Sequence, residues 1–158
     1  MKKHLIFPVA VILFVCTSAV AQTTFILVRH AEKENTPNDP GLTKEGQERA
    51  RSLVRLLEKQ KVDAIYSTNY NRTKNTVQPL ANAKEVTIQT YQSLNTEEII
   101  AKYQGGTVVI CGHSNTIPQL ANTLLGSKKF DNFDDSDYGN ILIVTVTSGE
   151  KILTHLRY

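Results

Sequence analysis

An apolar run near the start of the chain ends directly at an arginine and a histidine. Residues 25–28 read Phe-Ile-Leu-Val, and Arg29 and His30 follow them. A short apolar run bounded by polar residues is typical of a strand buried inside a sheet. In open α/β sheets, ligands bind at the edge where such strands end. The run therefore predicts a strand that carries Arg29 and His30 to a ligand-binding edge, with His30 doing chemistry there.

Further short runs of apolar and β-branched residues predict the remaining strands. Residues 64–66 and 107–111 read as two more strands, and residues 86–89 suit an edge strand. Residues 140–147 and 152–157 form a terminal pair, which is joined by a short connection that contains a glycine. Such a connection favours an antiparallel pair at one edge of the sheet.

Helical patterns separate these strands. One helix begins after the N-cap Thr43 and ends near Lys59, because apolar residues recur at helical spacing between them. A second covers residues 72–83, with a kink or break at Pro79. A short helix from Asn95 to residue 103 and another over residues 117–125 follow.

Strands that alternate with amphipathic helices indicate βαβ units. The fold class that we predict is α/β, a three-layer α/β/α sandwich around a mostly parallel sheet. A chain of 158 residues fits one such domain and a short leader.

The first 21 residues have the features of a secretory signal peptide. Lys2 and Lys3 precede an apolar run over residues 5–15, and Ala19 and Ala21 supply the small-residue pattern of a cleavage site. We therefore predict a signal peptide at 1–21, a domain at 22–158, and a periplasmic or secreted protein. An uncleaved anchor is the alternative, although the run is short for a span of about 20 residues.

Charge and composition narrow the choice of partners. Removing Lys2 and Lys3 lowers the formal net charge from +3 to +1. No basic run is interleaved with aromatic residues, so nucleic acid is not an expected partner. After signal cleavage we also expect no stable association with a membrane.

Three polar clusters follow predicted strands: Arg29-His30, residues 67–72, and Gly112-His113-Ser114. The carboxyl ends of parallel strands share one edge of a sheet, so these clusters are expected to converge. Two guanidinium groups and two imidazoles in one place indicate an anion, and arginine suits phosphate oxygens. The helix after Ser114 presents its N-terminus to the same anion. A zinc site is disfavoured because the arginines would repel a cation.

These residues also match a known family in four places, in order along the chain. They are Arg29-His30-Ala31-Glu32, Leu42-Thr43 with Gly46, Ser67 with Arg72-Thr73 and Thr76, and Gly112-His113-Ser114. Together they resemble the histidine phosphatase superfamily, which has the phosphoglycerate-mutase-like fold. The short length is similar to the small branch that includes bacterial phosphohistidine phosphatases and lacks the inserted cap.

The resemblance implies a role for each matching residue. His30 would be the nucleophile that forms a phosphohistidine, and Arg29 and Arg72 would clamp the phosphoryl oxygens. His113 would stabilise the transition state, and the hydroxyl of Ser67 and the backbone around Ser114 would make further contacts with the substrate. The resemblance implies a small phosphorylated substrate and neither a metal nor a cofactor.

The chain departs from the family pattern at the general acid. Larger members carry a glutamate near the position of Asn95. The candidates to replace it are Glu97, Glu98, Glu32 and Asp39, and Glu98 also suits a capping box with Asn95. Without an acid, phosphoramidates, anhydrides and aryl phosphates would be favoured over alkyl phosphates. A non-catalytic phosphate-binding domain and a mutase are the alternative functions.

Overall fold

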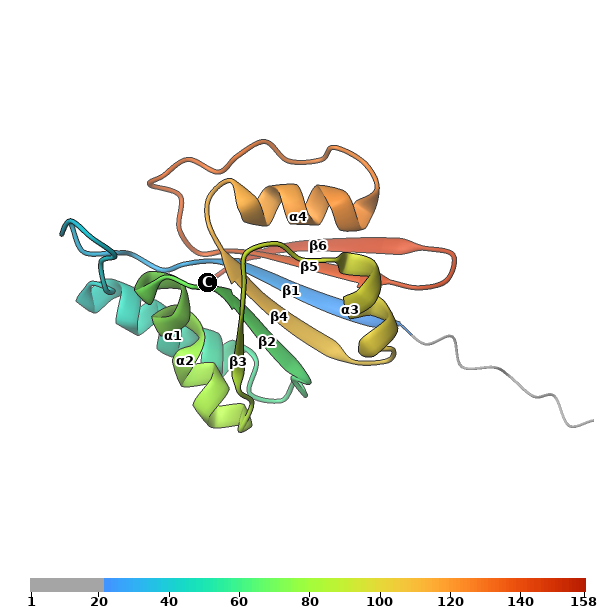
Figure 1. Ribbon diagram of the computed structural model, residues 1–158, viewed down its shortest axis with the longest axis horizontal. Coiled ribbons are helices and arrows are strands. Elements are labelled where there is room, and N and C mark those ends of the chain that lie inside the picture. Colours follow the sequence, from blue (N-terminus) through green and yellow to red (C-terminus); the bar gives the residue numbers. More distant parts are fainter. Residues whose placement is uncertain (1–21) are drawn as a thin grey trace, which may run out of the picture.

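Residues 22–158 are described by the structure, a computed structural model, and they form a six-stranded sheet with helices on both faces (Figure 1). The strand order is β3-β2-β4-β1-β5-β6. The strands are β1 (Thr23–Arg29), β2 (Ala64–Thr68), β3 (Ile88–Tyr91), β4 (Thr107–Gly112), β5 (Asn140–Val146) and β6 (Lys151–Arg157). The two most apolar strands, β1 and β4, lie at the centre, where both faces of the sheet are covered.

The direction of the strands divides the sheet into two parts. Strands β3, β2, β4 and β1 are parallel to one another, whereas β5 and β6 add an antiparallel pair beside β1. This arrangement confirms the predicted mostly parallel sheet with an antiparallel edge. The parallel strands β1, β2 and β4 end at the same edge, and the pairing of Arg29 with Gly112 sets His30 beside His113.

The helices form the outer layers. They are α1 (Lys44–Leu56), α2 (Asn71–Lys84), α3 (Thr96–Lys102) and α4 (Thr116–Leu125). Ile26 and Val28 point to the face that packs against α1 and α2. Phe25 and Leu27 point to the opposite face, which packs against α3 and α4 (Figure 1). The alternation of side chains along β1 therefore builds both cores, and the predicted three-layer sandwich is confirmed.

Helix α2 differs from its prediction because it continues through Pro79 and ends at Lys84. Val77 and Leu80 flank the proline and are completely buried, so packing holds the helix together across the missing N–H donor. The helix then ends with Glu85 in the left-handed conformation, and the N–H of Val86 donates to the carbonyl of Ala81. Strand β3 consequently begins at Ile88, two residues later than predicted.

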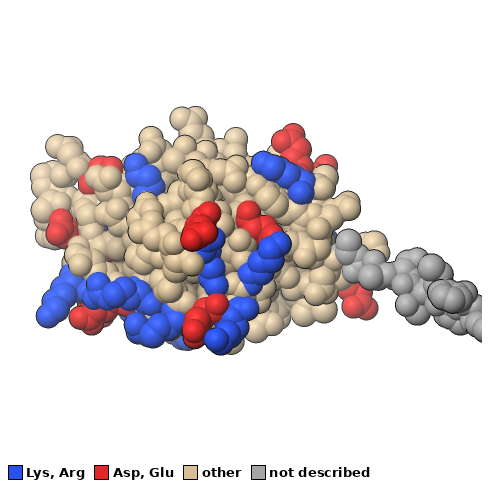
Figure 2. Space-filling model, turned by 90° about the horizontal axis from the view of Figure 1, so that it is seen from below, with Lys and Arg blue, Asp and Glu red and all other residues tan. Residues whose placement is uncertain are grey.

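Basic and acidic side chains are interspersed on the face shown in Figure 2. Among the described helices, none has the length and apolar character that a membrane crossing requires. The predicted signal peptide at 1–21 lies outside the described residues, and it stays a prediction.

Candidate active site

The ends of three parallel strands bring the two histidines of the predicted site together. The backbone N–H of His30 donates to the carbonyl of Gly112 at 2.9 Å, directly after the last pair of β1 and β4. The ring centroids of His30 and His113 are 5.6 Å apart. The convergence of the first and third polar clusters therefore follows from strand register.

The ring of His30 is held in one tautomer. It is 5 % exposed, and its Nδ1 lies 2.8 Å from the carbonyl oxygen of Ala31, which can only accept a hydrogen bond. The pKa of His30 is lowered to about 4, mainly by burial and also by the charges of Arg29, Arg72 and His113, against the raising effect of the Ala31 carbonyl. At neutral pH the ring is therefore uncharged, with its proton on Nδ1 and a lone pair on Nε2.

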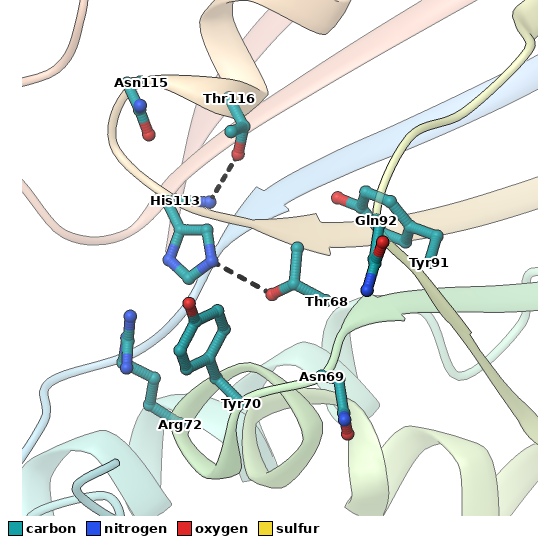
Figure 3. A pocket seen from close by; sticks show the side chains of 9 residues that line it. All are labelled: Thr68, Asn69, Tyr70, Arg72, Tyr91, Gln92, His113, Asn115 and Thr116. Carbon is teal, nitrogen blue, oxygen red and sulfur yellow. Dashed lines mark hydrogen bonds between the residues drawn. The ribbon is translucent and has the colours of Figure 1, made fainter. Parts of the chain in front are cut away.

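A chain of hydroxyl groups orients His113. The Thr73 hydroxyl donates to the carbonyls of Thr68 and Tyr70, so it accepts from the Thr68 hydroxyl at 3.0 Å. The Thr68 hydroxyl has then used its proton, and it accepts from Nε2 of His113 at 3.0 Å (Figure 3). Burial, together with Arg72 and Arg29, lowers the pKa of His113. A second donor, at Nδ1, is available only when the ring is cationic.

Arg72 enters the site from the first turn of α2 with its guanidinium largely unused. Its side chain is 18 % exposed, and no hydrogen bond joins it to another described residue. The nearest carboxylate oxygen, from Asp39, is 3.8 Å away, and the guanidinium lies over the Tyr70 ring at 4.3 Å. A largely buried cation with free donors favours the binding of an anion.

Arg29 is instead held by the loop between α4 and β5. Its Nη1 donates to the carbonyls of Asp134 and Asp137, and its Nη2 donates to the carbonyl of Asp135 at 2.9 Å. The guanidinium also lies 4.2 Å from the centre of the Tyr138 ring. Arg29 therefore adds positive charge to the site but keeps fewer donors for a ligand than the predicted clamp needs.

Two adjacent pockets open at this edge of the sheet. The first, about 490 Å³, lies against His30 and is lined by both arginines, His113 and Ser114. The second, about 650 Å³, is lined by Thr68, Tyr70, Tyr91 and Gln92, and it shares Arg72, His113 and Asn115 with the first (Figure 3). The site thus has room for an anion beside His30 and for a larger group next to it.

Comparisons with known proteins agree with this geometry. The sequence model of the histidine phosphatase superfamily (branch 1) matches residues 25–96, which run from β1 to the start of α3. Over these residues the chain is similar to the histidine phosphatase superfamily. A search of curated protein sequences returned no match.

Several solved structures share the fold of this chain. A putative phosphohistidine phosphatase SixA from Agrobacterium tumefaciens has a TM-score of 0.62 and 17% identity, over 85% of this chain and 98% of that one. Bacillus stearothermophilus YhfR has a TM-score of 0.67 and 16% identity, over 84% and 95%. A phosphoserine phosphatase mutant from Entamoeba histolytica, in complex with phosphoserine, has a TM-score of 0.64 and 20% identity, over 84% and 95%.

The superfamily motif residues outside the pocket have structural explanations. A Cβ atom on Gly46 would lie 2.2 Å from the carbonyl oxygen of Glu32, so only glycine lets α1 approach the segment after His30. The Thr76 hydroxyl accepts from the N–H of Ala31 and donates to the carbonyl of Arg72. It thereby ties the histidine segment to the helix that carries the second arginine.

The two predicted substrate-binding serines differ in position. Ser114 lines the pocket around His30. Ser67 is completely buried, and its hydroxyl donates to the carbonyl of Thr68 at 3.0 Å. The structure therefore does not support a direct substrate contact for Ser67, because the strand places its side chain in the core.

The four predicted general acids do not line the pocket around His30. Glu97 and Glu98 are exposed on the first turn of α3, where Glu98 accepts from the Asn95 side chain. Glu32 is bound by the guanidinium of Arg49, which lowers the pKa of its carboxyl. Asp39, in the loop before α1, lies 3.8 Å from Arg72, which does line that pocket.

The loop of residues 134–138 contributes to the site although it carries no sequence motif. Its carbonyls bind Arg29, and Asp135 and Tyr138 line the pocket. No sequence signal marks backbone carbonyls as arginine ligands. Within residues 22–158, no three His, Cys, Asp or Glu side chains gather closely enough to hold a metal ion.

Proposed function

We propose that this protein is a phosphatase that forms a covalent phosphohistidine on Nε2 of His30. The observation that carries the proposal is the pairing of a neutral, oriented imidazole with the unused guanidinium of Arg72 in one pocket. The imidazole supplies a lone pair, and the guanidinium supplies donors for phosphoryl oxygens. Similarity to the superfamily supports phosphatase function in general.

The proposed reaction has two steps. The Nε2 lone pair attacks phosphorus while the bond from phosphorus to the leaving oxygen breaks, and that oxygen takes the electron pair and a proton. Water then attacks the phosphohistidine, the P–N bond breaks, and Nε2 regains its lone pair. Arg72 and cationic His113 would stabilise the charge on the phosphoryl oxygens, so the chemistry requires no metal ion.

The test compares wild-type protein with His30→Ala on aryl, alkyl and anhydride phosphates. We expect His30→Ala to reduce turnover by at least about 10³-fold, as expected for the loss of a nucleophile. A single-turnover experiment with ³²P-labelled substrate should label wild type with an acid-labile, base-stable phosphoramidate. His155→Ala is the matched control, because His155 is an exposed histidine on β6 outside both pockets. Labelling that survives in His30→Ala would contradict the proposal.

A non-catalytic phosphate-binding domain is the second candidate, because none of the four predicted general acids lines the pocket around His30. Such a domain would bind inorganic phosphate with Arg72 but would form no phosphoenzyme. Calorimetric binding of phosphate without labelling of His30 would favour this alternative. The mutase alternative would instead give transfer of labelled phosphate to a second hydroxyl.

We also propose that the domain is exported after cleavage between Ala21 and Gln22. The support is the pattern of residues 1–21. The test is N-terminal sequencing of the protein recovered from the periplasm or medium, where the first residue should be Gln22. Recovery of the intact chain in a membrane fraction would favour the uncleaved anchor. In an exported protein, small phosphate esters or polyphosphates are the expected substrates.

A further inference from the structure

The pocket around His30 contains one acidic lining residue among the described residues, and it is Asp135. Asp135 comes from the loop between α4 and β5, on the side where Arg29, Ser114 and Tyr138 line the same pocket.

The backbone carbonyl of Asp135 is held by Arg29, while its side chain is exposed to solvent. Its carbonyl accepts from Nη2 of Arg29 at 2.9 Å, and its carboxylate accepts from the Ser114 hydroxyl at 3.0 Å. The carboxylate also lies 3.6 Å from Nη2 of Arg29, and the side chain is 94% exposed. A carboxyl group that is anchored beside the nucleophile, yet reaches solvent, has access to both a departing group and incoming water.

The other aspartates of this loop have partners of their own and do not line the pocket around His30. Asp131 pairs with Lys128, and Asp137 pairs with Arg157 on β6. The carboxylate of Asp134 accepts from the backbone and hydroxyl of Ser136. Asp135 is thus distinguished by its position at the His30 pocket and not by the acidic composition of the loop.

We propose that Asp135 is the proton donor for the leaving group in the phosphatase reaction of His30, on which this inference rests. The Asp135 carboxylate first takes a proton from solvent. As the Nε2–P bond forms and the P–O bond breaks, the carboxyl passes that proton to the leaving oxygen. The resulting carboxylate then takes a proton from the water that attacks phosphorus, while the P–N bond breaks. Asp135 is protonated again, and the cycle closes with no other donor.

The test is Asp135→Asn, in which the amide oxygen still accepts from Ser114 but the side chain cannot supply the proton. We compare kcat/KM for an alkyl phosphate, glycerol phosphate, with kcat/KM for p-nitrophenyl phosphate, whose leaving group needs no proton. The alkyl value should fall by about 10²-fold or more, while the aryl value stays within about threefold of wild type. The ratio of the two values cancels any change in phosphate affinity that follows from removing a negative charge.

Asp131→Asn is the matched control, since Asp131 lies in the same segment but lines a different pocket with Lys128. It should leave both kcat/KM values unchanged. An equal loss on both substrates would show a structural role for Asp135 and would overturn the proposal. Equal gains would show that the carboxylate merely competes with the substrate for Ser114 and Arg29, and would overturn it too. Failure of the underlying phosphatase function would look different, because wild type would then form no phosphoenzyme on His30.

Discussion

Arg29 and Arg72 reach the same pocket from two different elements, and the protein uses their guanidinium groups differently. Arg29 is the last residue of β1, and its side chain is 3% exposed and donates hydrogen bonds to three loop carbonyls. Arg72 lies in the first turn of α2, and its side chain makes no hydrogen bond to a described residue. One arginine therefore fastens a loop over the site, and the other is left with donors for a ligand.

The difference shows that residue type alone does not assign a role in an anion site. Both side chains are long cations beside His30, and both line its pocket. Their roles depend on what else lies within reach of their donors. If this comparison is right, replacing Arg72 should mainly reduce activity, whereas replacing Arg29 should also reduce stability.

The largest expected effect is that of Arg72→Ala on catalysis. Because Arg72 supplies the unused donors, we expect kcat to fall by about 10²- to 10³-fold, as for removal of a transition-state donor. Arg72→Lys should recover only part of this, because an ammonium lacks the planar fork. Steady-state kinetics with an aryl phosphate provides the measurement. The thermal midpoint of unfolding should not fall. A large loss of stability would contradict the view that Arg72, unlike Arg29, is not needed to hold the structure.

Arg29→Ala tests whether Arg29 holds the loop between α4 and β5. It removes three hydrogen bonds from a buried cation to loop carbonyls, so we expect the free energy of unfolding to fall by about 3 kcal/mol. Chemical denaturation at neutral pH measures this change. Protease cleavage within residues 134–138 should also become faster, because the loop loses its anchor. A fully stable Arg29→Ala protein would show that the loop is held by other contacts.

The pH dependence of stability tests whether the two cations share their pocket with a neutral His30. The pKa of His30 is lowered from 6.5 to about 4, mainly by burial and then by Arg29, Arg72 and His113. Between these two values the unfolded state binds more protons than the folded state, so the free energy of unfolding rises with pH across this window. Full conversion of the shift gives an upper limit of about 3 kcal/mol.

Denaturation curves at pH 4.5 and pH 7 provide the check, with His30→Ala as the comparison. The variant should lose a large part of the pH dependence, and the part that remains should include His113, whose pKa is lowered in the same direction. An unchanged pH dependence would contradict the buried, neutral state of His30.

Thr68→Val probes the orientation of His113 beside Arg72. The substitution removes the hydroxyl that accepts from Nε2, so we expect about a tenfold loss in kcat, which corresponds to one hydrogen bond. Thr68→Ser keeps the hydroxyl and should restore most of the activity. A similar loss in both variants would point to packing of the Thr68 methyl group instead.

The smallest expected effect concerns Asp39, the carboxylate nearest to Arg72. Its side chain is 38% exposed and its Oδ1 lies 3.8 Å from Nη1, so the pair is weak. Asp39→Asn keeps an acceptor for the N–H of Asn71 but removes the charge. We expect KM for a phosphate ester to fall by up to about fivefold with little change in kcat. A rise in KM would show that Asp39 positions Arg72 for binding.

The sequence by itself determined the architecture and the three strand ends that carry the site. Apolar runs at residues 25–28 and 107–111 place two strands at the centre of the sheet, because only a strand covered on both faces is apolar throughout. Parallel pairing then brings residues 30 and 113 to one edge. Local chemistry also predicted the N-caps Thr43 and Asn95, whose side chains accept hydrogen bonds from their own helices.

Only the tertiary structure decided how the donors and acceptors at that edge are shared. The carbonyls that bind Arg29 come from residues 134–137, more than 100 positions away, and a backbone carbonyl has the same chemistry at every position. The burial of Ser67 depends on which face of β2 it takes, and the pocket position of Asp135 depends on the path of a loop without regular structure. Residue type and local spacing therefore predict which groups meet, whereas the packing of distant segments decides which of them remain free to bind a ligand.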